Sequence, residues 1–156
     1  INSDGSEIHE VLRAPAIVPS WHPSGRILAY ISAPPGVTDA EEIYTLDLPS
    51  GPQTRLTWDG SIKDHPNYSP DGTRIAYMFQ HNGPPEVWIA NADGSGARRF
   101  TFGGGLYPEW SPDGKRIVYT KYDWMNNDPQ NGVLWILDVE TGEELQLTTK
   151  WPSECP

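Results

Sequence analysis

Several features are scarce in this sequence, and each scarcity excludes a class of protein. The 156 residues include one cysteine, Cys155, which excludes an internal disulfide framework or a cysteine-rich zinc site. Only 11 residues are Lys or Arg against 21 acids, and the net charge of −10 argues against binding to a nucleic-acid backbone. No apolar run approaches the roughly 18 residues of a membrane span, so we expect no membrane insertion. The sequence begins at Ile1 without Met, which is typical of a processed or excised segment.

Turn-forming and aromatic residues, by contrast, are abundant. The 15 glycines and 16 prolines leave few uninterrupted windows of the roughly 10 residues that a helix needs. Seven Trp, seven Tyr and regularly spaced Ile, Leu and Val can form a hydrophobic core, which argues against a disordered chain. The composition therefore favours an acidic, turn-rich globular protein built from strands.

One sequence motif occurs three times. An aromatic residue followed by x-Pro-x-Gly recurs at spacings of 47 and 42 residues, in Trp21–Gly25, Tyr68–Gly72 and Trp110–Gly114. In each copy a proline lies two residues before the aromatic, and a short strand-like run ending in tyrosine follows the glycine. A glycine turn and an apolar residue followed by threonine come after second strand-like runs at 42–47, 86–91 and 133–138. Such self-similarity indicates a repeat protein.

The recurring residues have a physical role. Ser-Pro-Asp-Gly suits a type I turn, because serine, proline and glycine are favoured at its first, second and fourth positions. The first copy has His22 and Ser24 in place of Ser and Asp, and we expect the same turn there. The runs after the turns are apolar on both faces, which is typical of strands buried on both sides. We expect the core to include the aromatics that recur in the second runs, Tyr44, Trp88 and Trp135.

Each copy thus predicts four short strands joined by tight turns. The period of about 45 residues is typical of a four-stranded propeller blade. The copies resemble the TolB-type β-propeller repeat, a WD-like repeat with the pattern P-x-W-S-P-D-G followed by I-x-Y. The resemblance extends over residues 1–156 and implies an all-β fold of three four-stranded antiparallel blades with an extra N-terminal strand.

The repeat makes the chain a single propeller segment that does not form a closed ring alone. We expect three blades and a final linker at 17–57, 65–101, 107–148 and 149–156. Because residues 1–6 match residues 90–95, we expect 1–16 to be the outer strand of a preceding blade and a linker. Closed propellers need roughly four to eight blades, so we expect either the missing remainder of the propeller or a second copy as a partner. Two copies would make six blades, the number that the TolB resemblance implies.

The loops of such a fold lie on two opposite rims. The short, repetitive turns between strands 1 and 2 and between strands 3 and 4 form one rim, here called the turn rim. The longer strand 2–3 loops and the blade linkers form the other, here called the loop rim, at 31–41, 79–85, 121–132, 58–65 and 102–107. Variable loops held by a rigid scaffold usually carry binding, so we expect the binding site on the loop rim.

The loop rim supplies the candidate binding residues, which are Tyr122, Trp124, Asp128, Asp39, His81, Asp64 and His65. Trp and Tyr are common binding anchors, with the alternative that Trp124 folds back onto its own blade. His65 follows Asp64 just before an innermost strand, so we expect it near the central channel, where a metal-binding or catalytic role is the alternative to a solvated linker residue. Sugar binding through Tyr122 and Trp124 is a further alternative.

The sequence predicts no catalytic site, no metal and no other cofactor. It has no G-x-S-x-G elbow and no credible Cys/His pair, and nothing pairs Glu41, Glu42 and Glu86 as acid and base. Ca²⁺ is the one ion that the oxygen-bearing side chains of the longest loop could hold, namely Asp123, Asn126, Asn127 and Asp128. Their spacing fits no EF-hand loop, and Asn and Asp in turns usually cap backbone groups.

These observations favour a non-catalytic propeller that binds a protein or peptide. The TolB resemblance implies a periplasmic or extracellular setting, with which a single cysteine is compatible. Two alternatives stay open. One is the propeller, or gating part, of a larger hydrolase such as a prolyl-oligopeptidase-like peptidase, and the other is a structural subunit that self-assembles through open blade faces.

Overall fold

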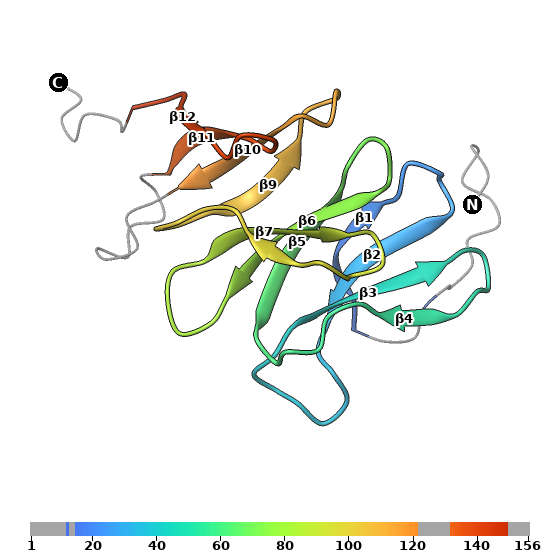
Figure 1. Cartoon of the computed structure of the whole chain (residues 1–156). Coiled ribbons are helices and arrows are strands. Elements are labelled where there is room, and N and C mark those ends of the chain that lie inside the picture. Colours follow the sequence, from blue (N-terminus) through green and yellow to red (C-terminus); the bar gives the residue numbers. More distant parts are fainter. Residues whose placement is uncertain (1–11, 13–14, 122–131, 150–156) are drawn as a thin grey trace, which may run out of the picture.

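The computed structural model describes residue 12 and residues 15–121 and 132–149, which form three four-stranded antiparallel sheets (Figure 1). The first sheet consists of β1 (Ile17–Trp21), β2 (Ile27–Ser32), β3 (Glu42–Asp47) and β4 (Gln53–Arg55). The second consists of β5 (Ile62–Tyr68), β6 (Arg74–Gln80), β7 (Glu86–Asn91) and β8 (Arg98–Arg99). The third consists of β9 (Leu106–Trp110), β10 (Arg116–Lys121), β11 (Val133–Asp138) and β12 (Glu144–Gln146). The predicted all-β class is confirmed.

The sheets lie side by side as three blades of an incomplete propeller, here called blades 1, 2 and 3 (Figure 1). In each blade the strands follow one another in chain order, and β1, β5 and β9 are the innermost strands, of which β5 contacts both β1 and β9. The predicted extra strand at the N-terminus lies outside the described residues, apart from residue 12. Within the described part of the chain, no helix is long and apolar enough to cross a membrane.

The predicted turns form in all three copies of the motif. The backbone N–H groups of Gly25, Gly72 and Gly114 donate to the carbonyl three residues earlier, at 2.8–2.9 Å. The first turn keeps this bond although His22 stands in place of serine. β5 and β9 start earlier than expected, at residues 62 and 106 in the predicted linkers, because both strands continue past a break in register.

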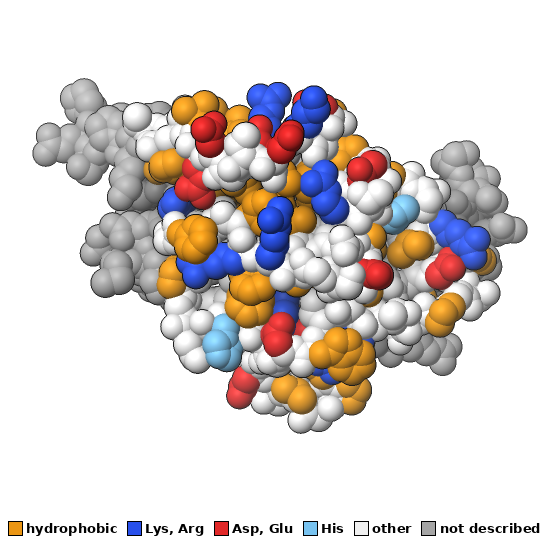
Figure 2. All heavy atoms as spheres, in the orientation of Figure 1, with side chains coloured by type: hydrophobic (Ala, Val, Ile, Leu, Met, Phe, Trp, Pro, Cys, Tyr) orange, Lys and Arg blue, Asp and Glu red, His pale blue; other side chains and the backbone are white. Residues whose placement is uncertain are grey.

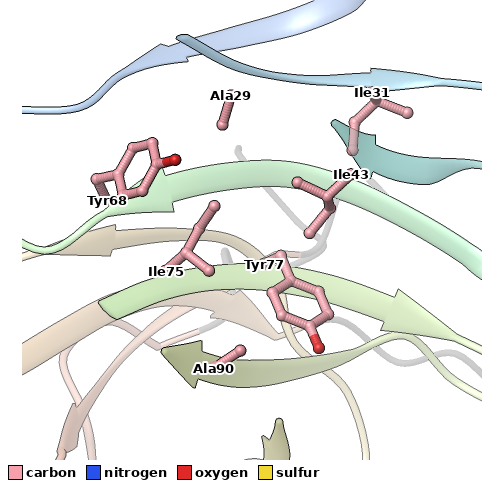
Figure 3. Packing of buried hydrophobic residues seen from close by; sticks show 7 residues of the cluster. All are labelled: Ala29, Ile31, Ile43, Tyr68, Ile75, Tyr77 and Ala90. Carbon is pink, nitrogen blue, oxygen red and sulfur yellow. The ribbon is translucent and has the colours of Figure 1, made fainter. Parts of the chain in front are cut away.

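The hydrophobic core lies between the blades. Between blades 1 and 2, the residues in contact are Ala29, Ile31, Ile43, Tyr68, Ile75, Tyr77 and Ala90 (Figure 3). Between blades 2 and 3, they are Ala76, Val87, Ile89, Ile117, Tyr119, Leu137 and Val139. Blade 2, which lies between the other two, is therefore buried on both faces, as its apolar runs predict.

We expected the three recurrent aromatics to be core residues, and the structure buries them less than that. Tyr44, Trp88 and Trp135 are only half-buried. They lie on the third strand of each blade, beside outer strands of just two or three residues, so little structure covers them. Trp88 packs against Phe79, with ring centroids 4.5 Å apart, and Lys121 lies over Trp135.

Candidate functional site

The structure places four of the seven predicted binding residues, all on loop-rim segments or the innermost strand of blade 2. Asp39 is exposed in the β2–β3 loop, and His81 is exposed in the β6–β7 loop. Asp64 and His65 lie on β5. The other three, Tyr122, Trp124 and Asp128, lie outside the described residues, as does the whole candidate Ca²⁺ loop at 123–128.

A β-bulge at the same position in each blade gives one residue of the innermost strand a positive φ angle. Val18, His65 and Tyr107 have φ values of 50°, 48° and 54°, and each precedes a proline. The register of the innermost strand shifts at these points in all three blades. Proline disfavours the right-handed helical conformation for the residue before it, and bulges re-aim side chains. The proline two residues before each aromatic therefore marks the bulge.

The bulges bring His65 and Tyr107 of neighbouring blades together. Their rings meet edge to face, with centroids 4.4 Å apart. His65 Nδ1 lies 3.0 Å from Asp64 Oδ2, although the angle is not that of a hydrogen bond. Two residues further along, the Asn67 amide donates to Glu109 Oε2 at 2.8 Å. Polar side chains thus join the innermost strands of blades 2 and 3.

His81 lies beside a hollow of about 310 Å³ on the loop rim. Its Nδ1 is 2.8 Å from Ser61 Oγ in the linker before β5, which fastens the β6–β7 loop to the linker. Phe79 and Trp88 line the hollow with aromatic rings, and Arg99 adds a positively charged side chain to its lining. Asp39 makes no hydrogen bond to His81 or His65 among the described residues, so hydrogen bonds do not join the four described candidates into one cluster.

A buried glutamate holds each of the two described linkers in place. In blade 2, Glu86 accepts hydrogen bonds from Arg99 at 2.7 Å, from Thr101 Oγ1 at 2.9 Å and from the Gly103 N–H at 3.0 Å. Thr101 Oγ1 also accepts the Val87 N–H at 2.9 Å. We call this arrangement the Glu-Arg-Thr clasp.

Blade 1 repeats the clasp with an added lysine. Glu42 accepts hydrogen bonds from Arg55 at 3.0 Å, from Thr57 Oγ1 and from the Gly60 N–H at 2.8 Å. The fully buried Lys63 lies 3.0 Å from Glu42 Oε2 and also contacts Asp59. These side chains together fix the linker between blades 1 and 2.

Blade 3 lacks the ion pair of the clasp. Val133 stands at the position of the glutamate and Gln146 at the position of the arginine. The threonine bond persists, because Thr148 Oγ1 accepts the Leu134 N–H at 3.0 Å. Both charged residues are thus absent together, which avoids a buried charge without a partner.

Each clasp arginine supports an exposed aromatic residue on the loop rim. The Arg55 guanidinium lies 4.3 Å from the ring centroid of Trp58, and that of Arg99 lies 4.2 Å from Phe102. Trp58 is 72% exposed and Phe102 is 68% exposed. A guanidinium that is hydrogen-bonded to a buried carboxylate is a rigid support, so both rings are held out toward solvent. Sequence analysis missed these four residues, although the pattern Arg-x-Thr-aromatic recurs 44 residues apart.

Two carboxyl groups in or near the linker between blades 1 and 2 have shifted pKa values. Burial, together with the nearby Asp64 carboxylate, raises the pKa of Glu41. Burial alone would raise the pKa of Asp59 too, but hydrogen bonds from Lys63 and Ser61 outweigh it and hold that pKa below its usual range. Figure 2 shows acidic, basic and hydrophobic side chains intermixed on one face. The described residues contain no group of three His, Cys, Asp or Glu that could hold a metal ion.

The arrangement is suited to recognition, because it offers rigid exposed rings, one hollow and flanking charges. Comparisons with known proteins add a family to this picture. The family model described as "TolB beta propeller domain" matches residues 2–156. An uncharacterized protein of Agrobacterium fabrum is 36% identical over 105 residues, which cover 66% of this chain and 35% of that protein.

Two further similar proteins are a protease homolog and a TolB protein of known structure. Tricorn protease homolog 1 of Streptomyces coelicolor is 30% identical over 112 residues, covering 70% of this chain and 10% of that protein. The crystal structure of TolB from Acinetobacter baumannii superposes with a TM-score of 0.76 at 27% identity, over 95% of this chain and 36% of that one. The chain therefore spans about a third of the Agrobacterium relative and a tenth of the Streptomyces one.

Proposed function

The chain belongs to the TolB β-propeller family, and on that premise we propose that it is a non-catalytic scaffold whose loop rim binds a protein or peptide partner. The observation that carries this proposal is the pair of exposed aromatics, Trp58 and Phe102, each stacked on the arginine of a buried clasp. Aromatic residues are enriched in protein interfaces, and Trp is enriched among the residues that dominate binding energy.

The rigid support of the two exposed aromatics favours the proposed binding role. An anchor that is already held in its bound position loses little conformational entropy when a partner binds. The clasps provide that rigidity for the loop-rim aromatics, since each arginine donates to a buried glutamate. The hollow beside His81 offers a place for one side chain of the partner.

The charge of the chain favours a basic or amide-rich partner. The net charge is −10, and the exposed Asp39 and half-exposed Asp59 and Asp64 contribute to it on this side of the molecule. Opposite charges steer association and are screened by salt, so binding should weaken as ionic strength rises. The likeness to TolB supports a periplasmic or extracellular location for this interaction.

A peptidase propeller is the second candidate function, because the Streptomyces relative is named a Tricorn protease homolog. In that case the chain would belong to a larger enzyme and would gate access to a catalytic domain. Hydrolysis of a labelled peptide mixture by the purified full-length gene product would favour this function over a scaffold role.

The test of the proposed function compares two exposed tryptophans on opposite rims. Trp58→Ala removes a loop-rim aromatic, and Trp21→Ala removes one of similar exposure next to a turn of the turn rim. Binding is measured by fluorescence anisotropy against an array of Lys-, Asn- and Gln-rich peptides. Trp58→Ala should weaken binding by about 1 to 3 kcal/mol, and Trp21→Ala should not. Equal effects of the two variants would contradict the assignment of the loop rim.

A further inference from the structure

The basic residues of this chain that lack an ion pair gather in one place. Of the 11 Lys and Arg residues, Arg13 and Lys150 lie outside the described part of the chain, and six of the other nine pair with a carboxylate there. The remaining three, Arg74, Arg98 and Lys115, make no such pair among the described residues. They line two hollows on the turn rim, and Arg74 lines both. We call these two hollows the basic seam.

The smaller hollow of the basic seam, of about 140 Å³, is lined by two arginines and by no carboxylate. Arg98 is exposed on β8, and its guanidinium lies 4.3 Å from the ring centroid of Phe100. Ile89 and Ala90 of β7 add apolar surface to the lining. The hollow therefore combines positive charge with apolar surface, which suits the carboxylate and the methylene groups of one acidic side chain.

Arg74, which lines both hollows, is held in place by blade 3. It donates to the carbonyl of Gly114, the turn glycine of blade 3, at 3.0 Å, and its guanidinium lies 4.5 Å from the ring centroid of Trp110. The Trp110 indole N–H in turn donates to the Asn67 carbonyl of blade 2 at 3.1 Å. One N–H of the guanidinium is used in the bond to Gly114, and an arginine carries several more. A cation that is already fixed loses little conformational entropy when it binds a ligand.

The larger hollow, of about 300 Å³, carries charges of both signs. Arg74 and Lys115 line it together with Asp138 and Glu140. The Asp138 carboxylate accepts the backbone N–H groups of Glu140 and Thr141 at 3.0 and 2.9 Å. The two acids repel a compact, multiply charged anion such as phosphate, whereas they can accept the backbone N–H groups of an extended peptide. The mixed charge therefore favours a peptide over a small anion.

We propose that the basic seam binds an acidic peptide segment of a protein partner, with one Asp or Glu side chain in the smaller hollow between Arg74 and Arg98. The two guanidinium groups donate to that carboxylate, and the peptide continues along the larger hollow past Lys115. Ile89 and Val139, which line the two hollows, belong to the core between blades 2 and 3, so the seam follows an internal contact of the described structure. It lies on the rim opposite the exposed aromatics of the loop rim and is a second interaction surface.

Fluorescence anisotropy with an array of rhodamine-labelled, Glu- and Asp-rich peptides tests this proposal. The wild-type chain should bind acidic peptides and not the matched peptides with Gln and Asn in their place, although its net charge of −10 repels them as a whole. Arg98→Gln should weaken binding about tenfold or more, because it removes charged hydrogen bonds to the carboxylate. Arg26→Gln is the matched control, because Arg26 is also exposed on the turn rim but is paired with Asp47 of its own blade. It should change the dissociation constant less than about twofold.

Competition separates a peptide site from a site for a small anion. Inorganic phosphate should displace the peptide no better than sodium chloride of equal ionic strength does. Preferential displacement by phosphate, equal weakening by Arg26→Gln and Arg98→Gln, or no binding of any acidic peptide by the folded wild type would each overturn the proposal. Circular dichroism checks that each variant is folded. Trp58→Ala should leave the affinity for the acidic peptide unchanged, so this proposal and the proposed function of the loop rim can fail independently.

Discussion

The clasp of blade 2 can be tested by converting it into the form found in blade 3. Glu86→Val and Arg99→Gln together reproduce the pair Val133 and Gln146. Each single change instead leaves one charge of the pair without its partner. The structure therefore predicts that the two changes are strongly non-additive, because either change alone already breaks the pair and the second change then removes little more.

The magnitudes follow from the bonds involved. Glu86 accepts three hydrogen bonds, each worth about 1 kcal/mol net, so Glu86→Val should lower the free energy of unfolding by about 3 kcal/mol. The estimate stays at the low end for a broken buried pair, because the Arg99 side chain is 40% exposed and remains hydrated. Arg99→Gln leaves a buried carboxylate short of one partner and should cost about 2 kcal/mol. The double variant should cost about 3 kcal/mol rather than 5, which is a coupling of about 2 kcal/mol.

Urea denaturation of the wild type, both single variants and the double variant measures this cycle. Arg26→Gln serves as a control for the loss of an exposed ion pair and should change stability little. The Phe102 ring should also lose its support when Arg99 is changed, so loop-rim binding should weaken in both variants that lack this arginine. A coupling near zero would refute the reasoning, because it would mean that the pair contributes nothing in the folded chain.

Three further outcomes are expected. Hydrogen bonds from Ser69 and Thr73 lower the pKa of Asp71 to about 2, from 3.8. The stabilisation by Asp71 is therefore present above that unfolded value and is lost as the pH falls toward 2; urea melts of wild type and Asp71→Asn should differ at about pH 5 and converge at about pH 2. His22→Ala removes a contact between blades and should lower the free energy of unfolding by about 1 kcal/mol. An unchanged melting curve would show that this contact does not stabilise the fold. Trp124→Ala should cost about 1 to 3 kcal/mol of binding and barely change the melting temperature; a lower melting temperature with intact binding would make Trp124 a core residue.

Much of the fold could be predicted from the sequence, because its determinants are local. Proline and glycine set the backbone angles of the turns, and apolar residues on both faces of short runs indicate strands buried on both sides. The threefold recurrence of the motif then led to the family. The candidate site was harder to predict. His65 was expected in the linker just before the innermost strand and lies on that strand instead. The exposed aromatics Trp58 and Phe102 were missed, and Trp124 stays a prediction.

The Glu-Arg-Thr clasp shows why the candidate site could not be predicted from the sequence alone. Glu86 and Arg99 lie 13 residues apart on adjacent strands, and Glu86 resembles any glutamate at the start of a strand. Only the paired strands bring its carboxylate to Arg99, Thr101 and the Gly103 N–H. A carboxylate that would be solvated in an open loop thereby becomes a buried support for the loop rim.

The sequence by itself determined the strands, the turns and the repeat, whereas the tertiary structure decided which equivalent residues are covered. Trp21, Tyr68 and Trp110 hold the same place in the same motif, and nothing in the sequence separates them. Tyr68 is buried and Trp110 half-buried because a preceding blade packs on each, while Trp21 is 58% exposed. The burial of a side chain depends on which other residues pack against it in the folded chain. A repeated sequence pattern specifies the residue at each position but not those packing partners.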